Sequence, residues 1–133
     1  MIRIHLLGLL LLINCNSINL KPVTSQEILK EVRSYKGDKA VLVNVWATWC
    51  KPCIEEFPMI VDLEKSEKKL KVIFISADFL ENKIDAERFL VQQDIEEYSY
   101  IKNQKDQSFI DGLHADWTGA LPFTILFAKN TGK

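Results

Sequence analysis

The 133 residues suit one domain, which is long enough to bury a single hydrophobic core. The 17 Lys and Arg residues nearly balance the 18 Asp and Glu residues, so the charge pattern indicates neither nucleic-acid binding nor an acidic substrate. The function must therefore be inferred from a local site.

The first segment of the chain predicts export. An apolar run from Leu6 to Ile13 follows Arg3; it is far shorter than the ~20 residues of a transmembrane helix, but it fits the core of a secretory signal. The sequence ending in Cys15 resembles a bacterial lipoprotein signal, which implies a lipid on that cysteine. Alternatively, Cys15 is removed with the signal, or the segment is an uncleaved anchor. We assign residues 1–19 to a signal or anchor segment and residues 20–133 to one domain.

The domain is expected to begin with a helix, followed by a strand. Thr24 and Glu27 have the spacing of a capping box, so a helix is expected over residues 24–36. Residues 40–47 form an almost continuous β-favouring run, which predicts a strand covered on both faces.

An apolar stripe predicts a helix from Cys50 to about residue 69, kinked by the missing N–H and the ring of Pro58. The following elements are expected in chain order: a strand over 70–77, a helix over 82–93 capped by Asn82, a strand over 98–101, a helix over 109–113, a strand over 122–128 and a turn over 130–132.

This alternation of strands and helices predicts an α/β fold with a central sheet and helices on both faces. The chain stops at Lys133, directly after the last turn. A turn without a returning strand leaves an open sheet edge, so we expect a further strand and helix beyond Lys133.

The pair Cys50 and Cys53 lies where the strand over 40–47 passes into a helix. A disulfide between them closes too short a loop to stabilise the fold strongly. The amides and dipole of the helix N-terminus lower the pKa of the Cys50 thiol below its free value of ~8.5, so Cys50 is the candidate nucleophile. Lys51 adds a positive charge screened by solvent, and Pro52 suits a first-turn position. Cys53 can then resolve a mixed disulfide on Cys50.

Metal binding is the main alternative use of the two cysteines. A structural zinc site needs four ligands, and the sequence has no second CxxC pair. Copper carriage by Cys50, Cys53 and His114 stays open, although His114 also suits an ordinary surface position.

Two motifs carry a family resemblance: residues 43–58, which contain WATWCKPC at positions 46–53, and residues 117–124, with the sequence WTGALPFT. Together they resemble the thioredoxin superfamily and, more narrowly, the TlpA/ResA-type exported thiol-disulfide oxidoreductases. The resemblance implies a thioredoxin-like three-layer sandwich, a central mixed sheet with helices on both faces, in which residues 82–103 are a helix-plus-strand insertion.

The resemblance also implies site residues. The Leu121–Pro122 bond would be cis and face the disulfide, with the Leu121 backbone pairing with substrate; the alternative is a trans proline at the start of an edge strand. Glu56 matches an acidic residue near the cysteines, and helical spacing places it on the face of Cys53, where it can exchange a proton. The alternative for Glu56 is a solvated carboxylate, as expected for Glu55.

Four further residues are assigned by comparison or by residue type. Asn44 stands where cytoplasmic thioredoxins carry a buried aspartate, which favours Glu56 as the acid–base group. Trp46 is expected in the core and Trp49 on the surface that docks substrate. Trp117 either flanks the site or serves only in packing.

The expected function is therefore an exported protein-disulfide reductase of the cell envelope or periplasm. Its redox group is the Cys50–Cys53 disulfide, with no metal or other cofactor; its partners are protein dithiols and disulfides, apocytochrome c among them, and a membrane electron donor. We expect a monomer that binds no nucleic acid. The alternatives are a peroxide-reducing enzyme of the same fold, for which the early peroxidatic cysteine has no counterpart, and a non-enzymatic lipoprotein that only binds partners.

Overall fold

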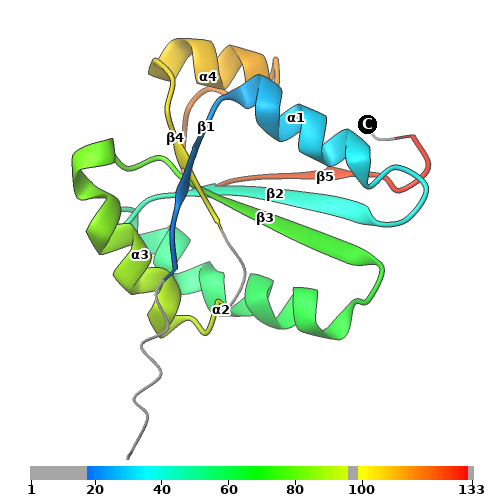
Figure 1. Cartoon of the computed structure of the whole chain (residues 1–133), viewed down its shortest axis with the longest axis horizontal. Helices are drawn as coiled ribbons and strands as arrows, with labels where there is room; N and C mark the ends of the chain where they lie inside the picture. The colour runs from blue at the N-terminus through cyan, green and yellow to red at the C-terminus, as the bar shows by residue number, and fades with distance from the viewer. Residues whose placement is uncertain (1–17, 96–98, 132–133) are drawn as a thin grey trace, which may run out of the picture.

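A five-stranded sheet with the strand order β1-β4-β3-β2-β5 forms the centre of the molecule (Figure 1). The computed structural model of the chain describes residues 18–95 and 99–131. The strands are β1 (Lys21–Val23), β2 (Ala40–Trp46), β3 (Leu70–Ser76), β4 (Tyr100–Lys102) and β5 (Phe123–Phe127). β5 runs antiparallel to β2, whereas the other neighbouring strands are parallel.

The two central strands are buried on both faces, as their apolar sequences predict. Val43 of β2 lies opposite Ile73 of β3 and Ile125 of β5. Alternation along β2 places Val41, Val43 and Val45 in one apolar cluster, whereas Leu42 and Trp46 belong to the cluster on the other face. The sheet therefore separates two hydrophobic cores.

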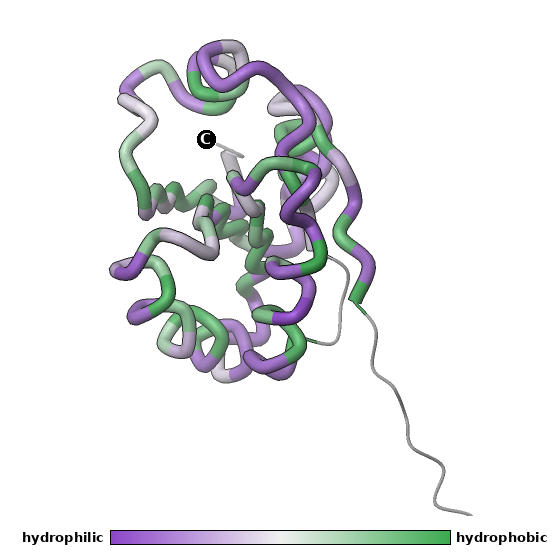
Figure 2. Tube along the Cα trace, turned by 90° about the vertical axis from the view of Figure 1, so that its left-hand side faces the viewer, coloured by the Kyte–Doolittle hydropathy of each residue, from purple (hydrophilic) through white to green (hydrophobic). Residues whose placement is uncertain are grey.

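Helices cover both faces of this sheet, α1 and α4 on one side and α2 and α3 on the other (Figure 1). The helices are α1 (Ser25–Ser34), α2 (Lys51–Ser66), α3 (Lys83–Gln92), α4 (Asp106–Leu113) and the short 3-10 helix η1 (Leu80–Asn82). Figure 2 shows the apolar central strands lying inside, with hydrophilic segments on the surrounding helices. Within the described ranges, no helix is both long and apolar enough to span a bilayer.

The predicted capping box at the start of α1 is confirmed. The backbone N–H of Thr24 donates to Oε2 of Glu27 at 2.8 Å, and the N–H of Glu27 donates to Oγ1 of Thr24 at 3.3 Å. The bond from the Thr24 backbone, then that from its hydroxyl, lowers the pKa of Glu27 below its ordinary value. The charged carboxylate therefore completes the helix terminus.

The start of α3 differs from the prediction. Asn82 precedes the helix, but its side chain makes no capping hydrogen bond. Residues 80–82 instead form η1, which leads directly into α3, so a preceding helical turn rather than a side-chain cap begins this helix. α2 continues without interruption through Pro58, and the kink stays a prediction.

β1 was not expected from the sequence, because three residues that include Pro22 carry no readable β pattern. It is defined by parallel pairing with β4, where Lys21 lies opposite Tyr100. Ile18 is 9% exposed and belongs to the core, so the packed domain includes this residue, which was assigned to the signal segment. Cys15, with the rest of residues 1–17, lies outside the described residues, as do positions 98 and 132 of the expected strand and turn.

Candidate active site

The two cysteines lie where β2 ends and α2 begins. Cys50 is the N-cap residue of α2, and Cys53 lies in its first turn. A disulfide joins them, with a Cα–Cα distance of 5.3 Å. Cys50 is 5% exposed and Cys53 only 1%. The residual access to this disulfide is therefore mainly through Cys50, the predicted nucleophile.

The N-terminus of α2 favours a negative charge at Cys50. The helix has 16 residues, and its first turn contains no acidic side chain that would oppose the dipole. Lys51 lies 3.8 Å from Glu55, and both side chains are largely exposed, so this ion pair contributes little. The helix end, rather than Lys51, is therefore the main source of positive potential beside Cys50.

Aromatic side chains fill the core beneath the disulfide. Trp46 packs edge-on against Phe57 at 5.2 Å, and Phe57 stacks on Phe74 at 4.2 Å. Trp46 is fully buried, whereas Trp49 is 68% exposed, which confirms the predicted placement of both tryptophans. Rigid packing thus supports the disulfide from below, while Trp49 projects from the surface beside it.

Glu56 lies half-buried on α2 and contacts Asn44 of β2. The Nδ2 group of Asn44 donates to Oε1 of Glu56 at 3.1 Å and to Oγ1 of Thr124 at 2.9 Å. Asn44 is 1% exposed, so these bonds form in a water-poor region. Glu56 is therefore oriented by a buried amide, unlike Glu55, which is exposed.

The loop before β5 forms one wall of a small cavity near the disulfide. The Leu121–Pro122 bond is cis, as the resemblance implied. Leu121 and Trp49 both line this cavity of about 140 Å³, together with Trp117. The indole of Trp117 stacks on Phe123 at 4.5 Å and donates from Nε1 to the carbonyl of Ala120 at 2.9 Å, so this tryptophan also holds the loop in place.

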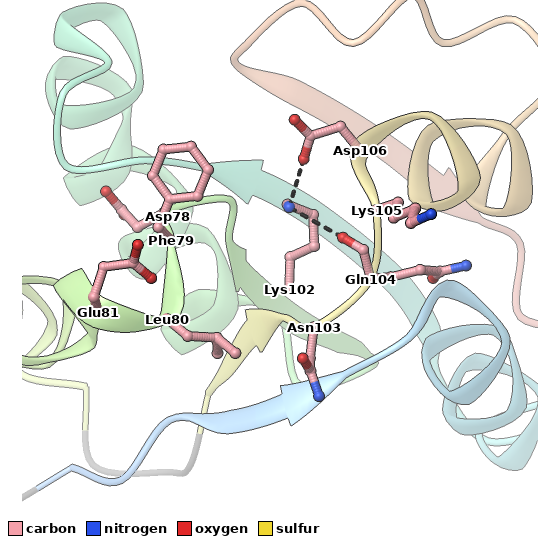
Figure 3. Close-up of a pocket in the computed structure, with 9 residues that line it drawn as sticks. All are labelled: Asp78, Phe79, Leu80, Glu81, Lys102, Asn103, Gln104, Lys105 and Asp106. Atoms are coloured by element: carbon pink, nitrogen blue, oxygen red, sulfur yellow. Dashed lines mark hydrogen bonds and ion pairs between the residues drawn. The ribbon is translucent and has the colours of Figure 1, made fainter.

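A larger open cavity of about 520 Å³ lies next to the small one, because Lys102 and Asp106 line both. In Figure 3, Phe79 and Leu80 lie on one side of this larger cavity and Gln104 and Lys105 on the other, with Lys102 between the two sides. The Nζ of Lys102 donates to Asp106 at 2.5 Å and to the Gln104 carbonyl at 3.2 Å. This surface was not predicted from the sequence, because it is assembled from two segments, residues 78–81 and 102–106, that carry no motif.

The fold thus brings together some, but not all, of the residues that the sequence predicted for the site. Cys50, Cys53, Trp49 and Leu121 lie around one surface, whereas Glu56 contacts Asn44 beneath it. His114 accepts a hydrogen bond from the Asp116 N–H and lies near the Phe123 ring. Across residues 18–95 and 99–131, no three His, Cys, Asp or Glu side chains are grouped so that they could hold a metal ion.

A role for Asp78 was likewise not predicted from the sequence. This residue has no motif around it, but in the structure its buried carboxylate contacts the turn that precedes Cys50. The only signal in the sequence was its place just after a predicted strand that neighbours the cysteine-bearing one.

Known proteins are similar to this chain in sequence. The thiol-disulfide oxidoreductase ResA of Geobacillus kaustophilus is 34% identical over 96 residues, which cover 72% of this chain and 52% of the relative. The chain therefore spans about half the length of the curated relatives that it matches.

Solved structures agree with the fold. A DsbF homologue from Corynebacterium diphtheriae is 28% identical, with a TM-score of 0.57 over 74% of this chain and 60% of that one. A thiol:disulfide interchange protein of the thioredoxin family from Chlorobium tepidum is 22% identical, with a TM-score of 0.54 over 71% of this chain and 65% of that one. The predicted thioredoxin-like fold is confirmed. Because residues 16–131 match the AhpC/TSA family, the chain belongs to that family.

Proposed function

We propose that this protein is a thiol-disulfide oxidoreductase that exchanges dithiol and disulfide with protein substrates. One observation carries the proposal: a disulfide joins two cysteines at the N-terminus of α2, with the more exposed sulfur-bearing residue at the N-cap. Such a position stabilises a thiolate, which is the attacking species in thiol-disulfide exchange.

The reaction in the reducing direction begins with both cysteines as thiols. The Cys50 thiolate attacks one sulfur of a substrate disulfide, the substrate S–S bond breaks, and the departing thiolate takes up a proton. Cys53, after losing its proton, attacks the sulfur of Cys50 and releases the second substrate thiolate. The products are a substrate dithiol and the Cys50–Cys53 disulfide described here, so two electrons have passed to the substrate. An external dithiol must then reduce the enzyme again.

We assign Glu56 the exchange of a proton with Cys53 during the second step. Glu56 follows Cys53 by three residues on α2, and its carboxylate is held by the amide of Asn44. A carboxylate fixed in this way is suited to accept the thiol proton as Cys53 becomes the attacking sulfur. The buried amide supports the assignment, because a freely solvated glutamate would lack such a partner.

Substrate recognition is proposed for the surface around Trp49 and Leu121. The cavity that they line is adjacent to the larger one at Phe79 and Leu80, and two neighbouring open cavities suit an extended polypeptide better than a small molecule. The exposed side chains of Trp49, Phe79 and Leu80 offer apolar contacts to a substrate at these two cavities. The Leu121 backbone is assigned the pairing with the substrate chain.

The wider setting is proposed from the sequence and the relatives. The signal-like segment supports export to the cell envelope, with Cys15 as the candidate lipid attachment site and residues 20–133 as the working domain. The resemblance to the TlpA/ResA type supports the reducing direction, apocytochrome c as one substrate and a membrane dithiol as electron donor. The protein would act as a monomer, with the Cys50–Cys53 pair as its whole redox equipment.

Two substitutions test the catalytic proposal. Cys50→Ser should abolish reduction of a protein disulfide such as those of insulin, because it removes the attacking sulfur. Cys53→Ser should instead accumulate a mixed disulfide between Cys50 and the substrate, visible by non-reducing electrophoresis and mass spectrometry. Undiminished turnover in the Cys50→Ser protein would contradict the proposal, as would equal trapping by both variants.

A further inference from the structure

Asp78 carries a buried carboxylate close to the reactive turn. It lies two residues beyond the end of β3 and is 1% exposed. Burying a carboxylate is unfavourable unless hydrogen bonds replace its contacts with water. In the described part of the chain, the bonds to this carboxylate come from neutral donors of only two residues, Thr48 and Ser76.

The two oxygens of Asp78 hold Thr48 at two points. The backbone N–H of Thr48 donates to Oδ2 at 3.0 Å, and its hydroxyl donates to Oδ1 at 2.6 Å. Ser76 fixes the carboxylate itself: its hydroxyl donates to Oδ2 at 2.8 Å and accepts from the Asp78 N–H at 3.1 Å. Hydrogen bonds to an ionised acceptor are shorter and stronger than neutral ones, so this is a firm attachment.

Thr48 belongs to the turn that delivers Cys50 to the start of α2. Within the turn, the Cys50 N–H donates to the Ala47 carbonyl at 3.1 Å. Trp49 cannot anchor the turn by burial, because its side chain is 68% exposed. Asp78 therefore supplies the side-chain attachment of this turn to the neighbouring strand, in addition to the backbone bond from Ala77 to Trp46 at 2.7 Å.

We propose that Asp78 is a positioning residue for thiol-disulfide exchange, which holds Cys50 at the N-terminus of α2 through its two hydrogen bonds to Thr48. The proposal rests on the proposed function, because it takes Cys50 as the reacting sulfur. Stabilisation of an anion by a helix end falls off within the first turn. A turn that loses its attachment to Asp78 therefore leaves the Cys50 thiolate less stabilised.

The test measures alkylation of Cys50 by iodoacetamide against pH in the reduced full chain, with mass spectrometry locating the label. Thr48→Val removes the hydroxyl donor but keeps the charge of Asp78. It should slow alkylation by roughly tenfold at neutral pH, the effect of raising the thiol pKa by about one unit. Thr48→Ser keeps both donors and should retain the original rate.

Ser99→Ala is the matched control for a lost buried bond, because the Ser99 hydroxyl donates to the Phe74 carbonyl at 2.8 Å, outside the reactive turn. It should lower the melting temperature without changing the alkylation profile. If Thr48→Val changes only the melting temperature, or if Ser99→Ala slows alkylation equally, Asp78 has a structural role and the proposal is wrong.

Substitutions of Asp78 decide between positioning and simple electrostatics, and serve if Thr48→Val does not fold. In Asp78→Asn, the asparagine can keep its oxygen on the Thr48 N–H and donate its NH2 to the Thr48 hydroxyl, so Asp78→Ala is measured beside it: it breaks both bonds to Thr48. Both variants remove a negative charge, which by itself would favour the thiolate, and the outcome is decided by Asp78→Ala. Slower alkylation supports positioning, whereas unchanged or faster alkylation overturns it. A wild-type chain that reduces no disulfide would contradict the proposed function but leave this comparison intact, because alkylation reports on Cys50 alone.

Discussion

Glu56 and Glu55 are adjacent carboxylates in different surroundings. Glu56 accepts a hydrogen bond from the buried amide of Asn44, whereas Glu55 is exposed and lies 3.8 Å from Lys51. If Glu56 accepts the proton of Cys53, replacing it by glutamine should slow the second step of exchange and leave the first unchanged. The contrast between two neighbours on one helix makes this role testable.

We therefore expect Glu56→Gln to slow the resolution of a mixed disulfide on Cys50 by up to about a hundredfold, the low end of general acid–base contributions. The measurement loads thionitrobenzoate onto Cys50 and follows its release by Cys53. Glu55→Gln is the matched control and should resolve the adduct at the wild-type rate. Equal rates in both variants would assign Glu56 to the structure rather than to proton transfer.

At the level of residues, the sequence identified those that stand in a motif. Cys50, Cys53 and Pro122 were recognisable from short patterns whose chemistry depends on spacing. Asp78 and Lys102 were not, because their roles arise only when β3 lies beside β2 and β4 in the sheet. Contacts between loops distant in sequence leave no local signal, so the support of the site could not be predicted.

At the level of elements, long apolar runs and a clear helical pattern of apolar residues were likewise predictable. β2 and β3 are long apolar strands, and α1 has both a capping box and an apolar stripe. β1 has three residues, and its strand character comes from pairing with β4 rather than from propensity. Tertiary pairing therefore decided what local sequence could not.

The contact between α1 and α4 depends on a glycine. A Cβ at Gly112 would lie 2.3 Å from Oγ of Ser25, which is fully buried. Gly112→Ala should gain about 1 kcal/mol of helix propensity but lose about 1–3 kcal/mol through overpacking. We expect a net decrease in the free energy of unfolding, measured by denaturant titration.

Ser25→Ala provides the partner for a double-mutant cycle. It removes the Oγ atom that the new methyl group would meet, and it costs the hydrogen bond from that atom to Gln104. The double variant should therefore be more stable than the sum of the single changes predicts. Strict additivity would show that the two helices separate freely at this contact, contrary to the packing described here.

At the scale of the whole molecule, one edge of the sheet gathers the functional segments. The turn after β2 carries Cys50, the loop after β3 carries Asp78 and Phe79, and the loop after β4 carries Gln104. These loops follow the carboxyl ends of parallel strands, which lie at the same edge of the sheet. The residues proposed for catalysis, support and docking are thus adjacent because of topology, although they are distant in sequence.

This arrangement predicts that docking and chemistry can be separated. Phe79 and Leu80 are 63% and 43% exposed and line the cavity in Figure 3. Their side chains are purely apolar, so they take no part in the hydrogen bonds that hold the turn before Cys50. The double variant Phe79→Ser, Leu80→Ser should lower kcat/KM for insulin by roughly tenfold, mainly through KM, because apolar contact area with the substrate is lost. Its reaction with a small aromatic disulfide should keep the wild-type rate.

Two apolar side chains elsewhere on the surface provide the control for this prediction. Met59 on α2 and Ile84 on α3 are 68% and 66% exposed, and neither lines the two cavities beside the disulfide. Met59→Ser, Ile84→Ser removes a comparable apolar surface and should leave kcat/KM for insulin unchanged. If both double variants weaken insulin reduction equally, general surface hydrophobicity governs recognition; if neither does, the substrate contacts only the region around Trp49 and Leu121.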